Sequence, residues 1–337
     1  MVMLHRPLVS VITINFNQAA YTLQMIDSLK RCGYENLEII VVDNASNNND
    51  VEAIATLHHD VKVLRLSENL GFAGGNNKGL EQAKGEYFLF LNNDTEVSEG
   101  FIEPLIAVFE QFPDAGMVSP RIHYFDSVEM KTIQYAGARK INLLTGRGSN
   151  IGWGETDMGQ YNYVLETDYA HGAALMFNRR ILKQLGCIPD QYFLYYEEHD
   201  WCTAMQRVGL KAYFCGKSVI FHKESISVGK NSPLKTYYMN RNRIMYLRRN
   251  ASFVKFSIAI LFYSFVSLPI AIIRFVLKRD FSHIKYYLWG ISWHFTHGKV
   301  IKGFPQIENL DSQNFKLTNE SNLYKEHVAF MDRLKSR

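Results

Sequence analysis

Short apolar runs alternate with segments of helical periodicity along the first part of the chain. The apolar runs predict strands at Leu8–Asn15, Leu37–Val42, Val61–Leu66, Tyr87–Leu91, Ala173–Phe177 and Lys211–Phe221. The periodic segments predict helices at Gln18–Cys32, Asp50–His58, Asn76–Lys84, Glu99–Phe112 and Glu197–Val208. Alternation of this kind is typical of βαβ units, so the pattern predicts an α/β fold with a mostly parallel sheet flanked by helices.

The pattern changes in two places. Residues 117–167 are rich in Gly, Tyr and Asn and have no clear period, which favours long functional loops. The composition shifts again near Pro233, so we expect an α/β domain over residues 1–228 and a helical region over residues 229–337. Its last stretch, Asp311–Arg337, is polar and predicts a surface helix or tail.

The helical region contains an uncharged run, Phe256–Ile273, between Lys255 and Arg274. Its length is at the short end for a membrane span, and Pro269 lies inside it. Aromatic residues typical of a membrane interface follow, at Tyr286, Tyr287, Trp289, Trp293 and Phe295. A packed helix, an interface-lying helix and a full span all remain open. The basic residues at both ends favour a helix that lies in the interface or is shallowly inserted.

The composition narrows the class of protein. Of the 337 residues 47% are hydrophobic and 13% aromatic, which supports a large core and excludes wholesale disorder. A net charge of +4 is too small to indicate nucleic acid, and we expect no such partner. The four cysteines form no CxxC pair, which favours buried, reduced thiols. Met1–Pro7 shows no apolar segment before a cleavage site, so we expect no signal peptide.

Polar residues end three of the predicted strands, at Asn15–Asn17, Asp43–Asn44 and Asn92–Asp94. Parallel strands present the same end to the same side, so these residues should line one rim, where α/β sheets bind ligands. Carboxylate and amide oxygens there suit a divalent cation that holds phosphate. The alternative for the third group is a helix N-cap at Asp94 or Thr95.

Two further segments carry candidate chemistry. Gly71–Asn76 is glycine-rich and predicts a turn that enters a helix, with backbone close enough to approach a ligand. Glu197–Asp200 places three acids among aromatic residues. These acids are either the ordinary acidic first turn of a helix or a desolvated group in which one carboxylate acts as a general base.

Five motifs in order resemble family 2 glycosyltransferases of the GT-A fold, in particular bacterial rhamnosyltransferase-like enzymes that build surface polysaccharides. They cover about residues 8–225, at Val11–Asn17, Val41–Ser46, Asn69–Asn76, Leu91–Thr95 and Tyr195–Asp200. The resemblance implies a GT-A catalytic domain over residues 1–228 and a C-terminal helical region, associated with the membrane, over residues 229–337.

The resemblance also implies roles for single residues. The nucleotide-sugar site would comprise Thr13, Asn15, Asp43, Asn69, Gly71, Gly74, Asn76, Asn92 and Asn93. Asp43 would accept a hydrogen bond from the base. Asp94 would bind Mg²⁺ or Mn²⁺, with Asn92 in the place of the usual first aspartate and His222 completing the metal ligands.

On the acceptor side, the resemblance makes Glu198 the base and Asp200 its nearest rival. The residues that would face the acceptor are His171, Gly172, Ala173 and Glu197. Arg241 and Arg243 either reach the diphosphate or form a basic face on a membrane-proximal helix, and the second interpretation is slightly favoured.

The function implied is that of an inverting, metal-dependent glycosyltransferase. It would move a sugar, rhamnose by resemblance, from a dTDP or UDP donor to a glycan acceptor linked to polyprenyl diphosphate, at the cytoplasmic face of the inner membrane. A nucleotidyltransferase is one alternative, but Asn15–Gln18 replaces the basic, glycine-rich loop expected after the first strand. A non-catalytic nucleotide-sugar-binding relative is the other.

Overall fold

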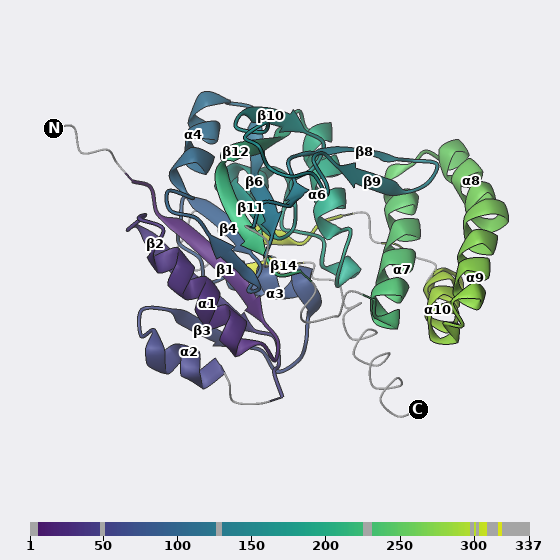
Figure 1. The fold of residues 1–337 in the computed structure, drawn as a ribbon, viewed down its shortest axis with the longest axis horizontal. Helices are drawn as coiled ribbons and strands as arrows, with labels where there is room; N and C mark the ends of the chain where they lie inside the picture. Colours follow the sequence, from purple (N-terminus) through teal and green to yellow (C-terminus); the bar gives the residue numbers. More distant parts are fainter. Residues whose placement is uncertain are drawn as a thin grey trace.

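A single large sheet forms the centre of the computed structural model, which describes residues 6–47, 51–125, 130–224, 231–296, 300, 303–308 and 316–318 (Figure 1). Its strands are β1 (Val9–Asn15), β2 (Leu37–Asp43), β3 (Lys62–Arg65), β4 (Tyr87–Leu91), β5 (Thr95–Val97), β6 (Ala115–Tyr124), β7 (Ile133–Tyr135), β10 (Val164–Thr167), β11 (Ala174–Asn178) and β12 (Lys211–His222). They follow the order β10-β12-β6-β11-β4-β1-β2-β3, with β5 beside β12 and β7 beside β6.

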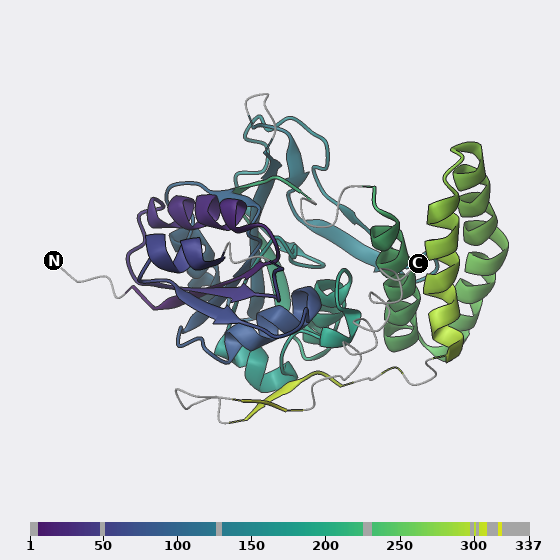
Figure 2. The ribbon, with the colours of Figure 1, turned by 90° about the horizontal axis from the view of Figure 1, so that it is seen from below.

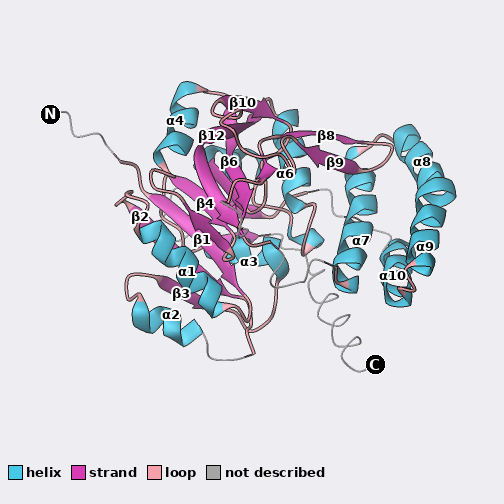
Figure 3. Ribbon diagram, viewed as in Figure 1, coloured by secondary structure: helices cyan, strands magenta, loops and turns pink. Residues whose placement is uncertain are grey.

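The predicted α/β architecture is confirmed. β4, β1, β2 and β3 are parallel neighbours, as are β6 and β12, whereas β11 is antiparallel to both β4 and β6. Helices cover both faces of the sheet (Figure 3). They are α1 (Ala19–Lys30), α2 (Val51–Leu57), α3 (Gly71–Leu80), α4 (Glu103–Gln111), α5 (Arg179–Leu185) and α6 (Glu197–Arg207).

The expectation of long loops over residues 117–167 is wrong. Most of β6 lies there, and the hairpin of β8 (Ala138–Asn142) and β9 (Arg147–Asn150) follows it. The reason is that β6 carries polar residues whose partners come from distant segments. Ser119 donates to the Ala174 carbonyl oxygen, and His123 lies 2.8 Å from the Asp157 carboxylate. Buried polar side chains with such partners interrupt the apolar run without breaking the strand.

The C-terminal region is helical, as predicted. It comprises α7 (Pro233–Asn250), α8 (Phe253–Phe262), α9 (Leu268–Leu277) and α10 (Phe281–Thr296). A π-helical turn, Tyr263–Ser267, joins α8 and α9 into one helix, Phe253–Leu277. By length and composition alone, that helix is long and apolar enough to cross a membrane. Only 11% of its most apolar 18-residue stretch is buried within the protein.

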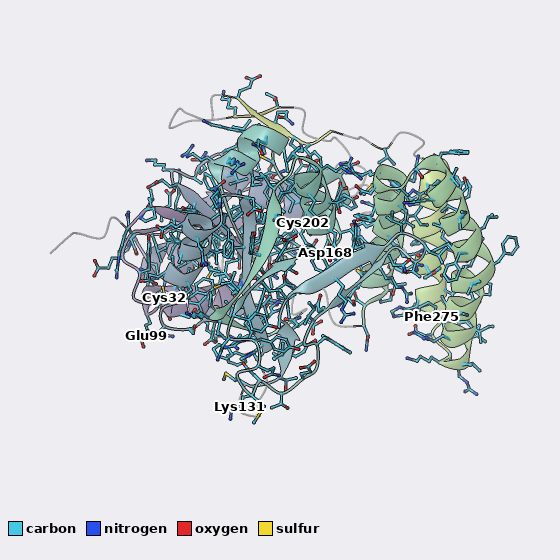
Figure 4. The ribbon with its side chains drawn as sticks, turned by 90° about the horizontal axis from the view of Figure 1, so that it is seen from above. Cys32, Glu99, Lys131, Asp168, Cys202 and Phe275 are labelled. Carbon is cyan, nitrogen blue, oxygen red and sulfur yellow. The ribbon has the colours of Figure 1, made fainter. Side chains whose placement is uncertain are left out.

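α10 lies between α7 and the α8–α9 helix (Figure 2). Gly290 lets α10 approach closely, because a Cβ there would lie 2.9 Å from the Tyr237 carbonyl oxygen. Within this layer Phe275 stacks on His283, and Figure 4 shows Phe275 at the end of the molecule away from the sheet. The α8–α9 helix is therefore the outermost layer.

α7 packs on the α/β part of the chain rather than presenting its charges to solvent. Arg241 is fully buried and Arg243 is 5% exposed, so the predicted basic face does not include them. Arg249 Nε lies 2.5 Å from Asp200 Oδ2 on α6, and Asn250 Nδ2 donates to Asp200 Oδ1. This buried ion pair fastens α7 to α6.

The chain returns to the α/β part after α10. β13 (Gln306–Glu308) pairs with β14 (Lys316–Thr318), and the Cys187 N–H donates to the Pro305 carbonyl oxygen at 2.7 Å. Lys316–Thr318 is thus a strand, and the rest of the tail predicted over Asp311–Arg337 lies outside the described residues.

The expectation of buried cysteines is confirmed. Cys32, Cys187, Cys202 and Cys215 are all buried, and none of these four forms a disulfide. Cys32 and Cys202 lie in separate parts of the α/β unit (Figure 4). Burial raises the pKa of Cys202 to about 12, so that thiol stays protonated.

Removing Arg249 should destabilise the fold, because Asp200 would be left as an unpaired buried charge. We expect Arg249→Ala to lower the free energy of unfolding by about 3–5 kcal/mol, measured by denaturant titration. The surface pair Arg65–Glu52, whose side chains are about half exposed, is the matched control. Arg65→Ala should cost less than about 1 kcal/mol, and equal losses in the two variants would contradict the assignment.

Candidate active site

The polar ends of β1, β2 and β4 meet at one rim of the sheet. Asn15 is in register with Asp43, and Asn15 Nδ2 donates to Asp43 Oδ1 at 3.0 Å. The Thr22 hydroxyl donates to Asn15 Oδ1 and accepts from Asn93 Nδ2. Thr13 lies two residues before Asn15, and its hydroxyl is buried without a partner among the described residues. The network therefore fixes side chains from three neighbouring strand ends at one place.

The glycine-rich segment is helical, which corrects the predicted helix start at Asn76. α3 begins at Gly71, whose φ is +70°. Asn69 Oδ1 accepts from the Gly71 N–H and from Asn44 Nδ2, so Asn69 shapes this turn. Gly74 and Asn76 are buried in α3, whereas Asn69 and Gly71 contact Asn44 at the end of β2.

Asp94 and His222 come together beyond the end of β4. Thr95 pairs with His222 across β5 and β12, which places Asp94 Oδ1 3.2 Å from His222 Nε2. A strand follows Asp94, so the alternative of a helix N-cap is wrong. Asn92 lies at the turn, where its carbonyl oxygen accepts from the Thr95 hydroxyl at 2.6 Å.

The buried His222 Nε2 has no hydrogen-bond partner among the described residues, although it faces Asp94. A nitrogen and a carboxylate in this arrangement fit a divalent cation. The part of the chain that the structure describes contains no group of three His, Cys, Asp or Glu side chains that could hold a metal. A cation at this pair would therefore need further oxygen ligands from a substrate or from water.

The acid cluster lies at the start of α6, after a turn with positive φ at Phe193, Tyr195 and Tyr196. Burial and the nearby Glu198 raise the pKa of Glu197 well above its usual value, which favours its neutral form. Burial alone would raise the pKa of Glu198 as well. His199, whose Nδ1 lies 3.2 Å from Glu198 Oε1, and the nearby His171 act against burial, and the pKa of Glu198 is lowered below its usual value.

The lowered pKa of Glu198 favours its ionised form, whereas the Asp200 carboxylate already has hydrogen-bond partners. Both Asp200 oxygens have partners, since Oδ2 pairs with Arg249 and Oδ1 accepts from Asn250. The Oε2 atom of Glu198, in contrast, is buried without a hydrogen bond among the described residues. Of these two carboxylates, Glu198 has the oxygen available to accept a proton.

The segment His171–Ala173 lies close to both Glu198 and the Asp94–His222 pair. Gly172 leaves space beside Glu198, because a Cβ at Gly172 would lie 3.6 Å from the Glu198 carboxyl group. The His171 and His222 rings are 6.4 Å apart. Burial and the neighbouring His222 lower the pKa of His171 to about 3, and its Nδ1 accepts from the Ala173 N–H. His171 is therefore neutral, with its proton on Nε2.

Two residues that shape the site were not found from the sequence. Gln134 on β7 contacts the second nitrogen of His222, at 2.8 Å. Asn242 on α7 donates from one amide nitrogen to the carbonyl oxygens of Tyr192, Leu194 and Tyr195 in the turn before α6. Gln134 falls in a segment without periodicity and Asn242 in a polar helix, so no sequence pattern marks either one.

The turn before α6 is held by contacts from two other parts of the chain, α7 and the start of α3. Arg241 Nη2 donates to the Gln191 and Tyr192 carbonyl oxygens, and the Phe72 N–H donates to the Phe193 carbonyl oxygen at 2.7 Å. Satisfied carbonyl groups of this kind stabilise a turn whose φ values are unfavourable for residues other than glycine.

A mostly parallel sheet with polar strand ends at one rim, and an acidic helix start opposite them, defines a transferase of the GT-A fold. The chain belongs to glycosyl transferase family 2, whose family model matches residues 10–186. It is a glycosyltransferase, as the sequence predicts.

Its relatives agree with this family. The low-salt glycan biosynthesis hexosyltransferase Agl10 of Haloferax volcanii is 26% identical over 264 residues, which cover 75% of this chain and 81% of that protein. Among solved structures, the mannosyltransferase PcManGT from Pyrobaculum calidifontis, in complex with GDP-Man and Mn²⁺, aligns over 88% of this chain and 77% of its own. The TM-score is 0.52 and the identity 17%.

GalNAc-T7, solved with UDP, GalNAc and Mn²⁺, has the same fold. It aligns over 91% of this chain with a TM-score of 0.60 and 17% identity, and the alignment spans 62% of GalNAc-T7. At this identity the two solved structures support the fold alone.

Gly71→Ala should disturb the rim and the turn before α6 together. A Cβ at Gly71 would overlap the Phe193 carbonyl oxygen and ring. Gly100 is the matched control, because its φ is +65° and nothing lies within 4 Å of a Cβ there. Both substitutions, Gly71→Ala and Gly100→Ala, carry the backbone penalty of a positive φ. Because Gly71→Ala also overpacks its surroundings, we expect it to lower the free energy of unfolding by about 1–3 kcal/mol more than Gly100→Ala does. Equal unfolding midpoints in chemical denaturation would show that the contact with Phe193 is not tight.

Proposed function

We propose that the protein transfers a sugar from a nucleoside diphosphate sugar to a hydroxyl group of a glycan acceptor, with inversion. The observation that carries this proposal is that Glu198 and the Asp94–His222 pair both lie close to His171–Ala173. Displacement at an anomeric carbon needs a base on one side and stabilisation of the departing diphosphate on the other. No enzyme nucleophile is required, and a single displacement inverts the configuration.

The donor nucleotide would bind at the rim formed by β1 and β2. In this proposal Asp43 accepts from the base, and Thr13 and Asn15 line the same pocket. The buried Thr13 hydroxyl supports the assignment, since a ligand group would supply the partner that the described residues do not. Asn69 and Gly71 would stand beside the ribose or the sugar, while Asn92 and Asn93 would form the floor towards Asp94. Gly74 and Asn76 would act indirectly, by shaping α3.

Asp94 and His222 would hold Mg²⁺ or Mn²⁺. The unpartnered His222 Nε2 facing Asp94 fits such a cation, and diphosphate oxygens would complete the ligands. When bound, the cation would neutralise charge that develops on the departing diphosphate. Asp94 supplies the hard anionic oxygen, and Asn92 at the preceding turn is too weak a ligand to replace a carboxylate.

Glu198 would accept the proton of the attacking hydroxyl group. Its free Oε2 and lowered pKa support this role, because the carboxylate is ionised before substrate binds. The raised pKa of Glu197 favours its neutral form, which would add no second negative charge beside Glu198. His171, neutral and with its proton on Nε2, would donate a hydrogen bond to an acceptor or donor oxygen, and Gly172 and Ala173 leave space for the acceptor. Asp200 would hold α6 to α7.

For the substrates we propose a pyrimidine donor, dTDP or UDP, with rhamnose as the sugar on the strength of the motif resemblance. The acceptor would be a glycan on a polyprenyl diphosphate, in a surface-polysaccharide pathway at the cytoplasmic face of the inner membrane. The exposed side chains of the outermost helix support a membrane partner. They include Phe253, Ile258, Leu261, Phe265, Ile270, Ile273 and Leu277.

The arrangement of the helices favours an interface-lying helix over a span. The α8–α9 helix runs across one end of the molecule, and α10 and α7 separate it from the sheet (Figures 1 and 2). A spanning orientation would bring the polar surface of those neighbours into the hydrocarbon core, which is costly. With its outer face in the headgroup region, the helix buries only its apolar side chains.

Glu198→Gln should lower kcat about 10²–10⁴-fold with little change in stability, since the amide cannot accept the proton. The wild-type acid limb of the pH–rate profile should lie below the usual range for a glutamate, because the pKa of Glu198 is lowered, and it should vanish in the variant. Initial rates with a panel of dTDP and UDP sugars, recorded over a range of pH, measure kcat and the acid limb.

Asp200→Asn is the comparison. It should destabilise the fold, through unpaired Arg249, and leave kcat per folded molecule within about tenfold. If Glu198→Gln keeps near-normal turnover and folded Asp200→Asn loses it, the base would be Asp200 and not Glu198. Donor binding without hydrolysis or transfer in the wild type would instead indicate a non-catalytic binder.

Membrane binding should depend on the outer face of the α8–α9 helix. Because α7 holds the turn before α6, a deletion from Pro233 would also damage the active site, so point changes are the better test. We expect Ile258→Glu with Phe265→Glu, at positions 52% and 77% exposed, to abolish co-sedimentation with anionic vesicles.

Leu57→Glu, at an exposed apolar position on α2, is the control and should still sediment. Unchanged binding of the double variant would refute the surface assignment. Resistance of the wild type to extraction by alkaline carbonate would indicate a full span.

A further inference from the structure

The His222 ring contacts two side-chain oxygen atoms, one from Asp94 in the turn between β4 and β5 and one from Gln134 on β7. Its Nε2 faces Asp94 Oδ1 at 3.2 Å, and its Nδ1 lies 2.8 Å from Gln134 Oε1. An amide oxygen can only accept a hydrogen bond, so Nδ1 must carry a proton in this contact. The ring can then present the lone pair of Nε2 towards Asp94, as a metal ligand requires.

The backbone of β7 is built to aim Gln134 at this ring. Ile122 pairs with Tyr135 and the next residue of β6, His123, pairs with Ile133. Gln134 is therefore an extra residue between two consecutive pairs, which is a β-bulge. Bulges redirect a side chain that a regular strand would point elsewhere.

Burial makes the contact hard to replace. Gln134 and His222 are both 6% exposed. Asn150 Nδ2 donates to the Gln134 backbone carbonyl oxygen at 3.2 Å and so fixes the bulge from the β9 side. Little water can reach the pair, so loss of the amide would leave the His222 ring without a partner on Nδ1.

We propose that Gln134 is a positioning residue for the metal site: it fixes the ring orientation and tautomer of His222 so that Nε2 points at the cation shared with Asp94. The inference rests on the proposed function. Gln134 is neutral, so it orients His222 without adding negative charge. With one anionic ligand from the described residues, the cation would bind weakly alone and more tightly with a nucleoside diphosphate. A carboxylate at position 134 would make the imidazole a stronger donor and reduce that dependence.

The test measures Mn²⁺ binding itself, by the loss of the free-ion EPR signal, with and without UDP. We expect Gln134→Leu to weaken Mn²⁺ binding about 10–100-fold. Gln134→Glu should retain it or tighten it in the absence of UDP. Asn150→Ala, which loosens the bulge without removing the Gln134 amide, should weaken Mn²⁺ binding less than Gln134→Leu does. Thermal unfolding of each variant verifies that it is folded.

Two results separate this inference from the proposed function. If Asp94→Asn and His222→Ala lower Mn²⁺ affinity but folded Gln134→Leu does not, the positioning role is wrong and the metal site stands. If neither Asp94→Asn nor His222→Ala changes Mn²⁺ affinity, the metal site itself is wrong. Weaker binding in Gln134→Glu than in Gln134→Leu would also overturn the role, because it would mean that the amide donates to His222.

Discussion

The turn before α6 is the constraint on which the site depends. Phe193, Tyr195 and Tyr196 all have positive φ, which costs about 1–3 kcal/mol for each residue. The turn persists because its carbonyl groups find donors, chiefly the buried Asn242 and Arg241 of α7. Since α6 starts immediately after it, the position of Glu198 is set by a helix that lies some fifty residues later in the sequence.

The Asp94–His222 side of the site is positioned in a different way, by the pairing of strands in register. Asp94 follows β4 and precedes β5, and the pairing of β5 with β12 brings His222 to it. Strand pairing sets these positions to within a fraction of a residue, whereas the Glu198 side depends on a strained turn. The two halves meet at His171–Ala173, where the Ala173 carbonyl oxygen also accepts from the Asn92 N–H.

The sequence predicts what depends on local pattern. The apolar runs of β1, β2 and β4 and their polar ends at Asn15, Asp43 and Asn92 were found because buried parallel strands have a simple signature. The predicted start of α3 was wrong because it depends on Phe193, and β6 was missed because its buried His123 has its partner, Asp157, far along the chain. Gln134 and Asn242 could not be found at all. Their roles arise only when distant elements are brought together, and single residues carry no periodicity.

The stacking of the C-terminal helices has a consequence for the size of the acceptor. Packed helices lie about 8–10 Å apart, and α10 and α7 both stand between the α8–α9 helix and the turn before α6. With the outer helix resting on the bilayer, the reacting groups would stand about 20 Å above it, counting two such layers. The helices would then act as a molecular ruler. A lipid-linked chain of several sugars would reach Glu198, and a single sugar at the headgroups would fall short, so the enzyme would extend glycans already begun.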